Sequence, residues 1–210
     1  MSLFTNKKTI SPKSNSYSIN SNNPKASLLF YHYFDLCLSS ILPKNIENMI
    51  LLCIGTDRST GDCLGPLIGH ILHRNKYNNI HILGTLENPV HAKNLEKTLK
   101  TIKLKYSSPF IISLDACLGR HDSIGNINIS PGPLKPGAGV NKSLPEVGNM
   151  NITGIVNIGG YMEYTVLQST RLNTVMKMAD VITTGLNRHF DLISDSYFFN
   201  TATGKSYFDL

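Results

Sequence analysis

Apolar runs alternate with amphipathic segments from residue 26 onward. Four runs are apolar almost throughout and have the length of strands: 49–56 (MILLCIGT), 79–85 (NIHILGT), 110–116 (FIISLDA) and 152–160 (ITGIVNIGG). Runs of this kind are typical of a parallel sheet that helices cover on both faces. A further segment, 123–130, alternates apolar and polar residues and predicts a short strand or hairpin.

Helical periodicity marks the segments between and after these runs. The expected helices span 26–42, 63–75, 91–105 and 162–189. In the first helix Leu28 and Phe34 belong to the predicted apolar face, and Pro43 stands where a helix tends to stop. In the last helix Val175 and Ile182 recur on one side. The pattern predicts helices that pack one face against a sheet.

Strands that alternate with helices predict an α/β fold, a three-layer α/β/α sandwich around a mostly parallel sheet. Ligands bind such sheets outside the carboxyl ends of the strands, at the topological switch point. We therefore expect function in the loops after Thr56, Thr85, Asp115 and Ile158. The segment 131–148 is rich in Pro and Gly and predicts a long irregular loop of the kind that is usually functional or mobile.

Composition sets the size of the folded unit. The chain has 210 residues, of which 41% are hydrophobic and 16% charged, and this suits one large domain. Residues 1–25 are rich in Ser, Asn and Lys without periodicity. We expect a flexible polar arm there and a single domain over 26–210.

Charge and cysteine content narrow the partners and the compartment. The net charge is +6, but the basic residues are scattered without an Arg-rich stripe, so we expect no nucleic-acid partner. No secretion signal is readable, and no apolar stretch approaches the roughly 20 residues of a bilayer span. We therefore expect a cytoplasmic protein without a membrane partner. The four cysteines form no CxxC pair and are expected to be free thiols.

Two aspartates stand at predicted strand ends. Asp62 lies in the turn GDCLGP after the first strand, and Asp115 closes the run FIISLDA. Parallel strands bring their carboxyl ends to one edge of the sheet, so the two side chains should converge. Two adjacent carboxyl groups cannot both ionise cheaply, and one keeps its proton while the other can take a proton from water. The pair therefore indicates an aspartic-type hydrolase.

Other interpretations of these residues remain open. Asp62 could be the N-cap of the following helix, and the two aspartates could chelate a divalent cation with a nearby imidazole. Asp57 is typical of a turn, and four histidines are each expected at the surface, namely His70, His73, His91 and His121. Cys63 and Cys117 follow the aspartates closely and are expected to be packing residues rather than nucleophiles.

Four stretches together resemble the YyaC family of sporulation proteins. They are IGTDRSTGDCLGPLIG, SLDACLG, PGPLKPGAGVNK and VNIGGYMEYTVLQSTRLNTVMKMADVI, and the likeness runs from about Met49 to Phe190. That family is similar to the spore germination protease and, more distantly, to the hydrogenase maturation proteases. The resemblance implies a phosphorylase/hydrolase-like three-layer fold and an atypical aspartic endopeptidase architecture, in a spore-forming bacterium.

The resemblance also implies roles for individual residues. Asp62 and Asp115 match the two aspartates that the germination protease is thought to use, which makes them the expected catalytic pair. The Gly-rich loop of that protease resembles 135–142, and the implied substrate-binding residues are Gly137, Gly139, Asn141 and Lys142. The histidine that helps hydrogenase maturation proteases read nickel has no clear equivalent near Gly159–Tyr161. We expect no metal and no other cofactor.

These observations predict a sporulation-associated endopeptidase with a peptidase-like domain over 26–210. Its expected partner is a protein or peptide substrate, small acid-soluble spore proteins being one candidate. One aspartate would act as base toward water and the other as acid. A noncatalytic peptide- or metal-binding protein on the same fold is the main alternative, and a metal-dependent hydrolase is a weaker one. A homo-oligomer is left open.

Overall fold

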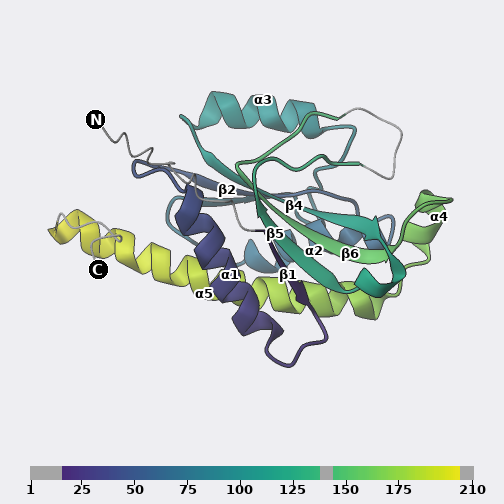
Figure 1. Ribbon diagram of the computed structural model, residues 1–210. Coiled ribbons are helices and arrows are strands. Elements are labelled where there is room, and N and C mark those ends of the chain that lie inside the picture. The colour runs from purple at the N-terminus through teal and green to yellow at the C-terminus, as the bar shows by residue number, and fades with distance from the viewer. Residues whose placement is uncertain (1–15, 138–143, 204–210) are drawn as a thin grey trace, which may run out of the picture.

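A six-stranded mixed sheet forms the centre of the protein in a computed structural model (Figure 1). The structure describes the backbone of residues 16–137 and 144–203, and side chains as far as residue 193. The strands lie in the spatial order β1 (Tyr17–Asn20), β5 (Asn126–Pro131), β6 (Met150–Ile158), β4 (Phe110–Gly119), β2 (Met49–Cys53) and β3 (Ile80–Leu83). The pairs β2–β3, β2–β4 and β4–β6 are parallel, whereas β5 runs antiparallel to β6 and to β1.

Helices cover both faces of this sheet. The helices α1 (Ala26–Ile41), α2 (Leu64–Leu72) and α5 (Leu172–Thr203) lie on one face, and α3 (Leu95–Lys105) lies on the other (Figure 1). Every residue of β2 is buried, as its continuous apolar run predicted. Alternate β2 residues enter two cores, with Leu51 in the larger one and Ile50 beside Ile102 of α3 in the smaller. The predicted three-layer α/β fold is confirmed.

The topological switch point lies between β2 and β4. The chain leaves β2 through α2 to reach β3 on one side, and leaves β3 through α3 to reach β4 on the other side. The carboxyl ends of β2 and β4 therefore border a crevice that no crossover connection closes. This crevice is the place where the strand order predicts a ligand site.

The buried face of α1 differs from the predicted one. Leu28 is 54% exposed, whereas Phe30 and Phe34 are completely buried. The ring of Phe30 packs against Gly185 of α5, where a Cβ atom would come within 2.4 Å of it. The helix turns its two phenylalanines inward because they bury more apolar surface than Leu28. The prediction that Leu28 belongs to the buried apolar face was therefore wrong.

The predicted helix over 162–189 is broken in two. A short α4 (Glu163–Gln168) precedes α5 (Leu172–Thr203). At the break the Thr170 hydroxyl donates to the Val166 carbonyl at 2.9 Å and accepts from the Asn157 amide at 3.2 Å. Side-chain hydrogen bonds of this kind compete with the helical backbone and end the helix. The apolar stripe of α5 is as predicted, since Val175 and Ile182 are completely buried.

The N-terminal segment contributes to the sheet. Residues Tyr17–Asn20 form β1, which pairs with β5 inside the region expected to be a polar arm. Tyr17 stacks on Tyr33 of α1 with a centroid distance of 4.7 Å, and Ile19 is buried. Residues 1–15 lie outside the described part of the chain.

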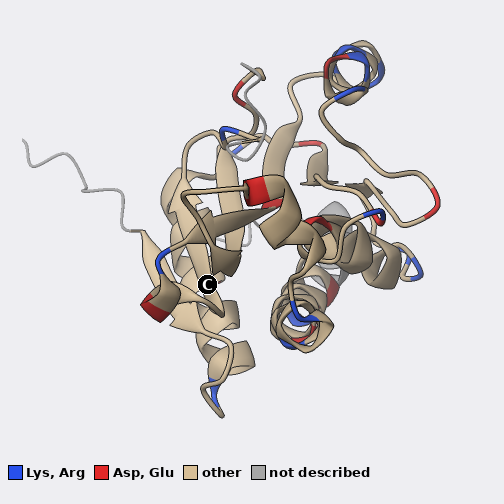
Figure 2. Ribbon diagram, turned by 90° about the vertical axis from the view of Figure 1, so that its right-hand side faces the viewer, with Lys and Arg blue, Asp and Glu red and all other residues tan. Residues whose placement is uncertain are grey.

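Charged residues are distributed over several elements (Figure 2). The helix α3 carries four lysines, and further basic residues lie on α5 and on the loops around α2. None of the helices in the described residues is both long enough and apolar enough to cross a membrane.

Candidate functional site

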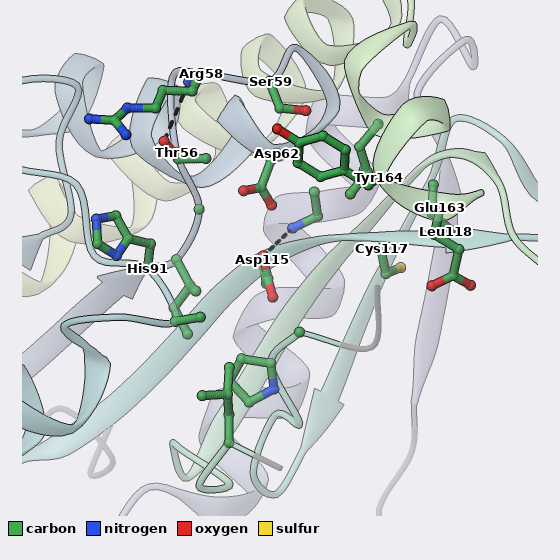
Figure 3. Close-up of a pocket in the computed structure, with 18 of the residues that line it drawn as sticks. Thr56, Arg58, Ser59, Asp62, His91, Asp115, Cys117, Leu118, Glu163 and Tyr164 are labelled. Atoms are coloured by element: carbon green, nitrogen blue, oxygen red, sulfur yellow. Dashed lines mark hydrogen bonds between the residues drawn. The ribbon is translucent and has the colours of Figure 1, made fainter. Parts of the chain in front are cut away.

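A cavity of about 360 Å³ opens at the topological switch point (Figure 3). Its walls come from five places that are distant in sequence: the loop after β2, the loop before α3, the end of β4, the segment between β5 and β6, and α4. Asp62 and Asp115 both line it, and Figure 3 shows their carboxyl groups pointing toward one another from different elements. The structure thus brings the two sequence-predicted aspartates together.

Asp62 lies on a short 3-10 helix, Gly61–Cys63, that precedes α2. Gly55 allows this segment to approach the end of β2, since it has φ +139° and a Cβ atom there would stand 2.0 Å from the Asp62 carbonyl oxygen. The Thr56 N–H donates to that carbonyl at 3.1 Å. The N-cap of α2 is Cys63, with no side-chain capping bond. The N-cap interpretation of Asp62 is therefore wrong, and its carboxyl group is free to face the cavity.

Asp115 is held by the sheet itself. It lies in β4 opposite Thr153 of β6 and is only 7% exposed. The Ala116 N–H donates to its Oδ1 at 2.8 Å, and the backbone of Gly137 supplies a second hydrogen bond. These bonds fix the orientation of the carboxyl group toward the cavity.

Burial makes both carboxyl groups weaker acids. Desolvation raises the pKa of Asp62, although His91 and a backbone hydrogen bond from Thr56 lower it in part. Desolvation and the neighbouring charge of Asp62 raise the pKa of Asp115 well above its ordinary value. Because the charge of Asp62 acts on Asp115, the two groups titrate as a pair. Asp62 holds the negative charge more readily, and Asp115 keeps the proton.

His91 is a site residue that the sequence did not reveal. It was expected at the surface, but it lines the cavity and acts electrostatically on Asp62. Asn94 positions it, since the Asn94 Oδ1 accepts from the His91 N–H at 2.8 Å at the start of α3. The only sequence signal was its place after the second predicted strand, where functional loops were expected.

Ser59 was also missed. It lines the cavity, is 9% exposed, and its hydroxyl has no hydrogen-bond partner among the described residues. A buried hydroxyl without a partner is costly and is rare outside functional sites. Its sequence neighbourhood, DRSTGD, has the composition of an ordinary turn and gives no signal of this.

The two cysteines beside the aspartates are poor nucleophiles. Burial raises the pKa of the Cys117 thiol to about 11, and burial together with Asp62 raises the pKa of Cys63. The thiolate is the reactive form of cysteine, so both side chains are inert at neutral pH. Their interpretation as packing residues agrees with this environment.

The predicted substrate-binding loop is described only in part. Gly137 lines the cavity, and its backbone already bonds to Asp115. The other predicted residues of this loop, Gly139, Asn141 and Lys142, lie outside the described residues.

The described residues offer no set of metal ligands. No group of three or more His, Cys, Asp or Glu side chains is arranged to hold an ion in the described ranges. Asp62, Asp115 and His91 share the cavity but do not form such a group.

This chain is similar to a solved structure and to a curated relative. The crystal structure of a [NiFe] hydrogenase maturation protease, HycI from Thermococcus kodakarensis KOD1, matches with a TM-score of 0.44 and 14% identity, over 67% of this chain and 93% of HycI. Uncharacterized protein YyaC from Bacillus subtilis (strain 168) is 54% identical over 151 residues, which cover 71% of this chain and 74% of YyaC.

The similarity to YyaC agrees with the family that the sequence motifs indicated. A family sequence profile described as "Protein of unknown function (DUF1256)" also matches residues 18–185, which include every strand except the first residue of β1. On both findings, this chain belongs to the DUF1256 family.

Proposed function

We propose that the protein is an endopeptidase in which Asp62 and Asp115 activate water against a peptide carbonyl. One observation carries this proposal: two carboxyl groups face one cavity at the switch point, both with raised pKa values and one raised further by the other. Catalytic carboxylate pairs work through such an unequal division of one proton. The sporulation role rests on the family resemblance.

The surroundings assign the two chemical roles. His91 and Thr56 favour the ionised form of Asp62, which makes Asp62 the base. Asp115 keeps its proton because of burial and the charge of Asp62, which makes it the acid. Asp62 takes a proton from water, the resulting hydroxide adds to the carbonyl carbon, and Asp115 gives its proton to the carbonyl oxygen. The leaving amine then takes up the proton that Asp62 received, Asp115 takes back the proton from the oxygen as the carboxyl product forms, and the C–N bond breaks.

Ser59 can assist the same step. General acid–base catalysis supplies only about 10²–10⁴-fold, so the carbonyl needs further polarisation. The Ser59 hydroxyl lines the cavity without a partner and can donate to a developing oxyanion. The Gly137 amide is less suited to this role because it is bonded to Asp115.

Incubation with small acid-soluble spore proteins tests the proposal, with the fragments followed by mass spectrometry. We expect Asp62→Asn and Asp115→Asn each to lower the cleavage rate by about 10²–10⁴-fold with folding intact, because each removes one proton-transfer group. Asp57→Asn is the matched control, since Asp57 is an exposed aspartate in the same loop and does not line the cavity.

Cleavage by either site variant at the wild-type rate would contradict the mechanism. Absence of cleavage by the wild-type protein, for the spore proteins and for an unfolded protein such as β-casein, would contradict the endopeptidase function. Saturable peptide binding in that case would support the noncatalytic alternative.

A further inference from the structure

The strand β4 continues beyond its neighbour β2. The last register pair between them is Cys53 with Leu114, and the Ile54 N–H donates to the Leu114 carbonyl at 2.7 Å. The chain then turns away from β4, because the Gly55 N–H donates to the Val90 carbonyl at 2.8 Å. The last five residues of β4, from Asp115 to Gly119, are paired only with β6. On the opposite edge of these five residues, the pairing with β2 has already ended.

The backbone pattern shows which groups lie on this free edge. Even-numbered residues of β4 face β2: the Phe110 N–H donates to the Asn48 carbonyl, and the Leu114 carbonyl accepts from Ile54. Odd-numbered residues face β6, since the carbonyls of Ile111 and Gly119 accept from residues at the two ends of β6. The alternation places the backbone groups of Ala116 and Leu118 on the free edge.

Most of these groups have no partner within the described ranges. The Ala116 N–H is bonded to Asp115, but apart from the ladder to β6, whose register shifts between Cys117 and Leu118, the Ala116 carbonyl and both backbone groups of Leu118 make no hydrogen bond within residues 16–137 and 144–193. The free edge lies in the cavity wall, which Asp115, Ala116, Cys117 and Leu118 all line. An unpaired strand edge is a template for another extended chain.

We propose that this edge binds an extended segment of the substrate as an added strand beside β4. The substrate main chain would take the position that β2 leaves vacant, donating to the Ala116 carbonyl and accepting from the Leu118 N–H. This deepens the proposed function, on which it rests, because the added strand would lie directly against Asp115. The edge would therefore present a main-chain carbonyl to the aspartate pair.

The cavity suits a polypeptide better than a compact ligand. Strand addition takes its affinity from main-chain hydrogen bonds and its specificity from alternate side chains. The cavity that contains the free edge has an apolar lining that would contact the alternate side chains of the substrate. This lining comes from Tyr164 and Leu167 of α4 and from Pro136 and Leu144. Tyr164 is 65% exposed, so most of its side chain is accessible to a bound chain. The substrate class is an unfolded segment with apolar residues at alternate positions.

Binding can be measured apart from hydrolysis in the Asp62→Asn/Asp115→Asn double variant. The probes are overlapping ten-residue peptides of β-casein, an unfolded protein, followed by fluorescence anisotropy. In the tightest binder each backbone nitrogen is then methylated in turn. We expect the loss of affinity to recur at every second position, because alternate N–H groups of a strand face its neighbour.

A variant of the edge itself gives a second measurement. Leu118→Pro removes the N–H that the alternation places on the cavity side, and Leu118→Ala is the matched control that keeps this N–H. We expect Leu118→Pro to weaken peptide binding about tenfold relative to Leu118→Ala, corresponding to the loss of one well-made hydrogen bond. Thermal unfolding reports whether both variants fold, and the methylation series does not depend on either of them.

The outcomes separate this inference from the proposed function. Absence of saturable binding by any casein peptide at 1 mM, about the weakest affinity worth measuring, overturns the strand addition. Affinity losses without a period of two also overturn it, even if the wild-type protein hydrolyses peptides. Periodic losses without hydrolysis by the wild-type protein support strand addition and overturn the peptidase function.

Discussion

His91 gives Asp62 a favourable neighbour that Asp115 lacks. Both carboxyl groups are desolvated, but the imidazolium lowers the pKa of Asp62, whereas the charge of Asp62 raises the pKa of Asp115. Their division into base and acid thus comes from the residues around them. The same side-chain type serves both roles because each stands in a different field.

We predict that His91→Ala moves the acidic limb of the kcat/KM–pH profile toward higher pH. This limb reports the ionisation of the base, and loss of the imidazolium leaves the desolvation of Asp62 less opposed. The rate on the limb should fall several-fold, while the plateau stays within about twofold. Peptide hydrolysis measured between about pH 4 and pH 9 checks this.

His91→Lys is the control, because it keeps a positive charge beside Asp62. Its acidic limb should remain at the wild-type position or move to lower pH. A limb that shifts equally in both variants would show that His91 acts through shape and not through charge.

The sequence revealed the aspartates but not their neighbours. Asp115 could be predicted because it closes an apolar run, where an unpaired carboxylate is costly, and Asp62 because its turn follows the neighbouring strand. Ser59 and His91 lie in polar turns, and there nothing in the local pattern separates a residue that lines a cavity from one that faces only solvent. Both line the cavity because the folded chain brings their loops to the end of β4, and a local pattern does not encode this.

The element that carries Asp62 is positioned by close backbone contact. At Gly65, in the first turn of α2, a Cβ atom would stand 2.1 Å from the Ile54 carbonyl oxygen. The helix can approach the end of β2 so closely only because position 65 has no side chain. The distance between Asp62 and Asp115 therefore depends on this contact.

We predict that Gly65→Ala destabilises the protein and impairs the site together. The obstructing atom belongs to the backbone and cannot rotate away, so the free energy of unfolding should fall by about 1–3 kcal/mol, as in other overpacked contacts. Displacement of α2 should also lower peptide hydrolysis. Urea unfolding and the cleavage assay measure the two effects.

Leu104→Ala is the control. It changes a residue of α3, another helix that covers the sheet, and Leu104 does not line the cavity. Leu104 is 89% exposed on α3, so its loss should change stability by less than about 0.5 kcal/mol. A Gly65→Ala protein with wild-type stability and activity would show that α2 has room to move.

At the level of elements, strands were easier to predict than helix ends. The apolar run of β2 reports burial on both faces directly, and the observed strand Met49–Cys53 lies within it. The break between α4 and α5 has no such signature. It depends on the hydrogen bond from Asn157 of β6 to Thr170, which joins residues that only the folded chain brings together.

At the scale of the whole molecule, buried titratable groups in the described residues change the stability of the fold in opposite directions as the pH falls. The raised pKa values of Asp62 and Asp115 mean that the folded state binds their protons more readily than the unfolded state. They therefore add stability as the pH falls. His189, 2% exposed between α1 and α5, has its pKa lowered to about 4 by burial, and Asp35 opposes this only in part. It binds a proton less readily when folded.

The surroundings of His189 explain why its pKa is lowered and not raised. Neither ring nitrogen has a hydrogen-bond partner in the described residues, and the Asp35 carboxyl oxygen lies 3.6 Å away from Nδ1, which is too long for a hydrogen bond. Below about pH 6.5 the unfolded chain takes up a proton that the folded chain refuses. The stability that neutral His189 permits is thus lost as the pH falls from about 6.5 toward 4.

We predict that His189→Phe makes the protein less sensitive to acid. The phenyl ring keeps the edge contact with Phe34 and cannot take up a proton. Between pH 7 and pH 4 the wild-type protein should lose about 3 kcal/mol more unfolding free energy than the variant, by the size of the pKa change. Urea unfolding at each pH, in the Asp62→Asn/Asp115→Asn background, measures this without the opposing carboxyl groups.

His32→Phe is the matched control for the same change of residue type, because His32 is an exposed histidine on α1. Restoring Asp62 and Asp115 should reduce the acid sensitivity of the protein that carries His189, since their protonation stabilises the fold over the same pH range. Equal slopes for His189→Phe and its parent would mean that the α1–α5 interface admits the charged imidazole. In that case His189 would add nothing to the acid response of the protein.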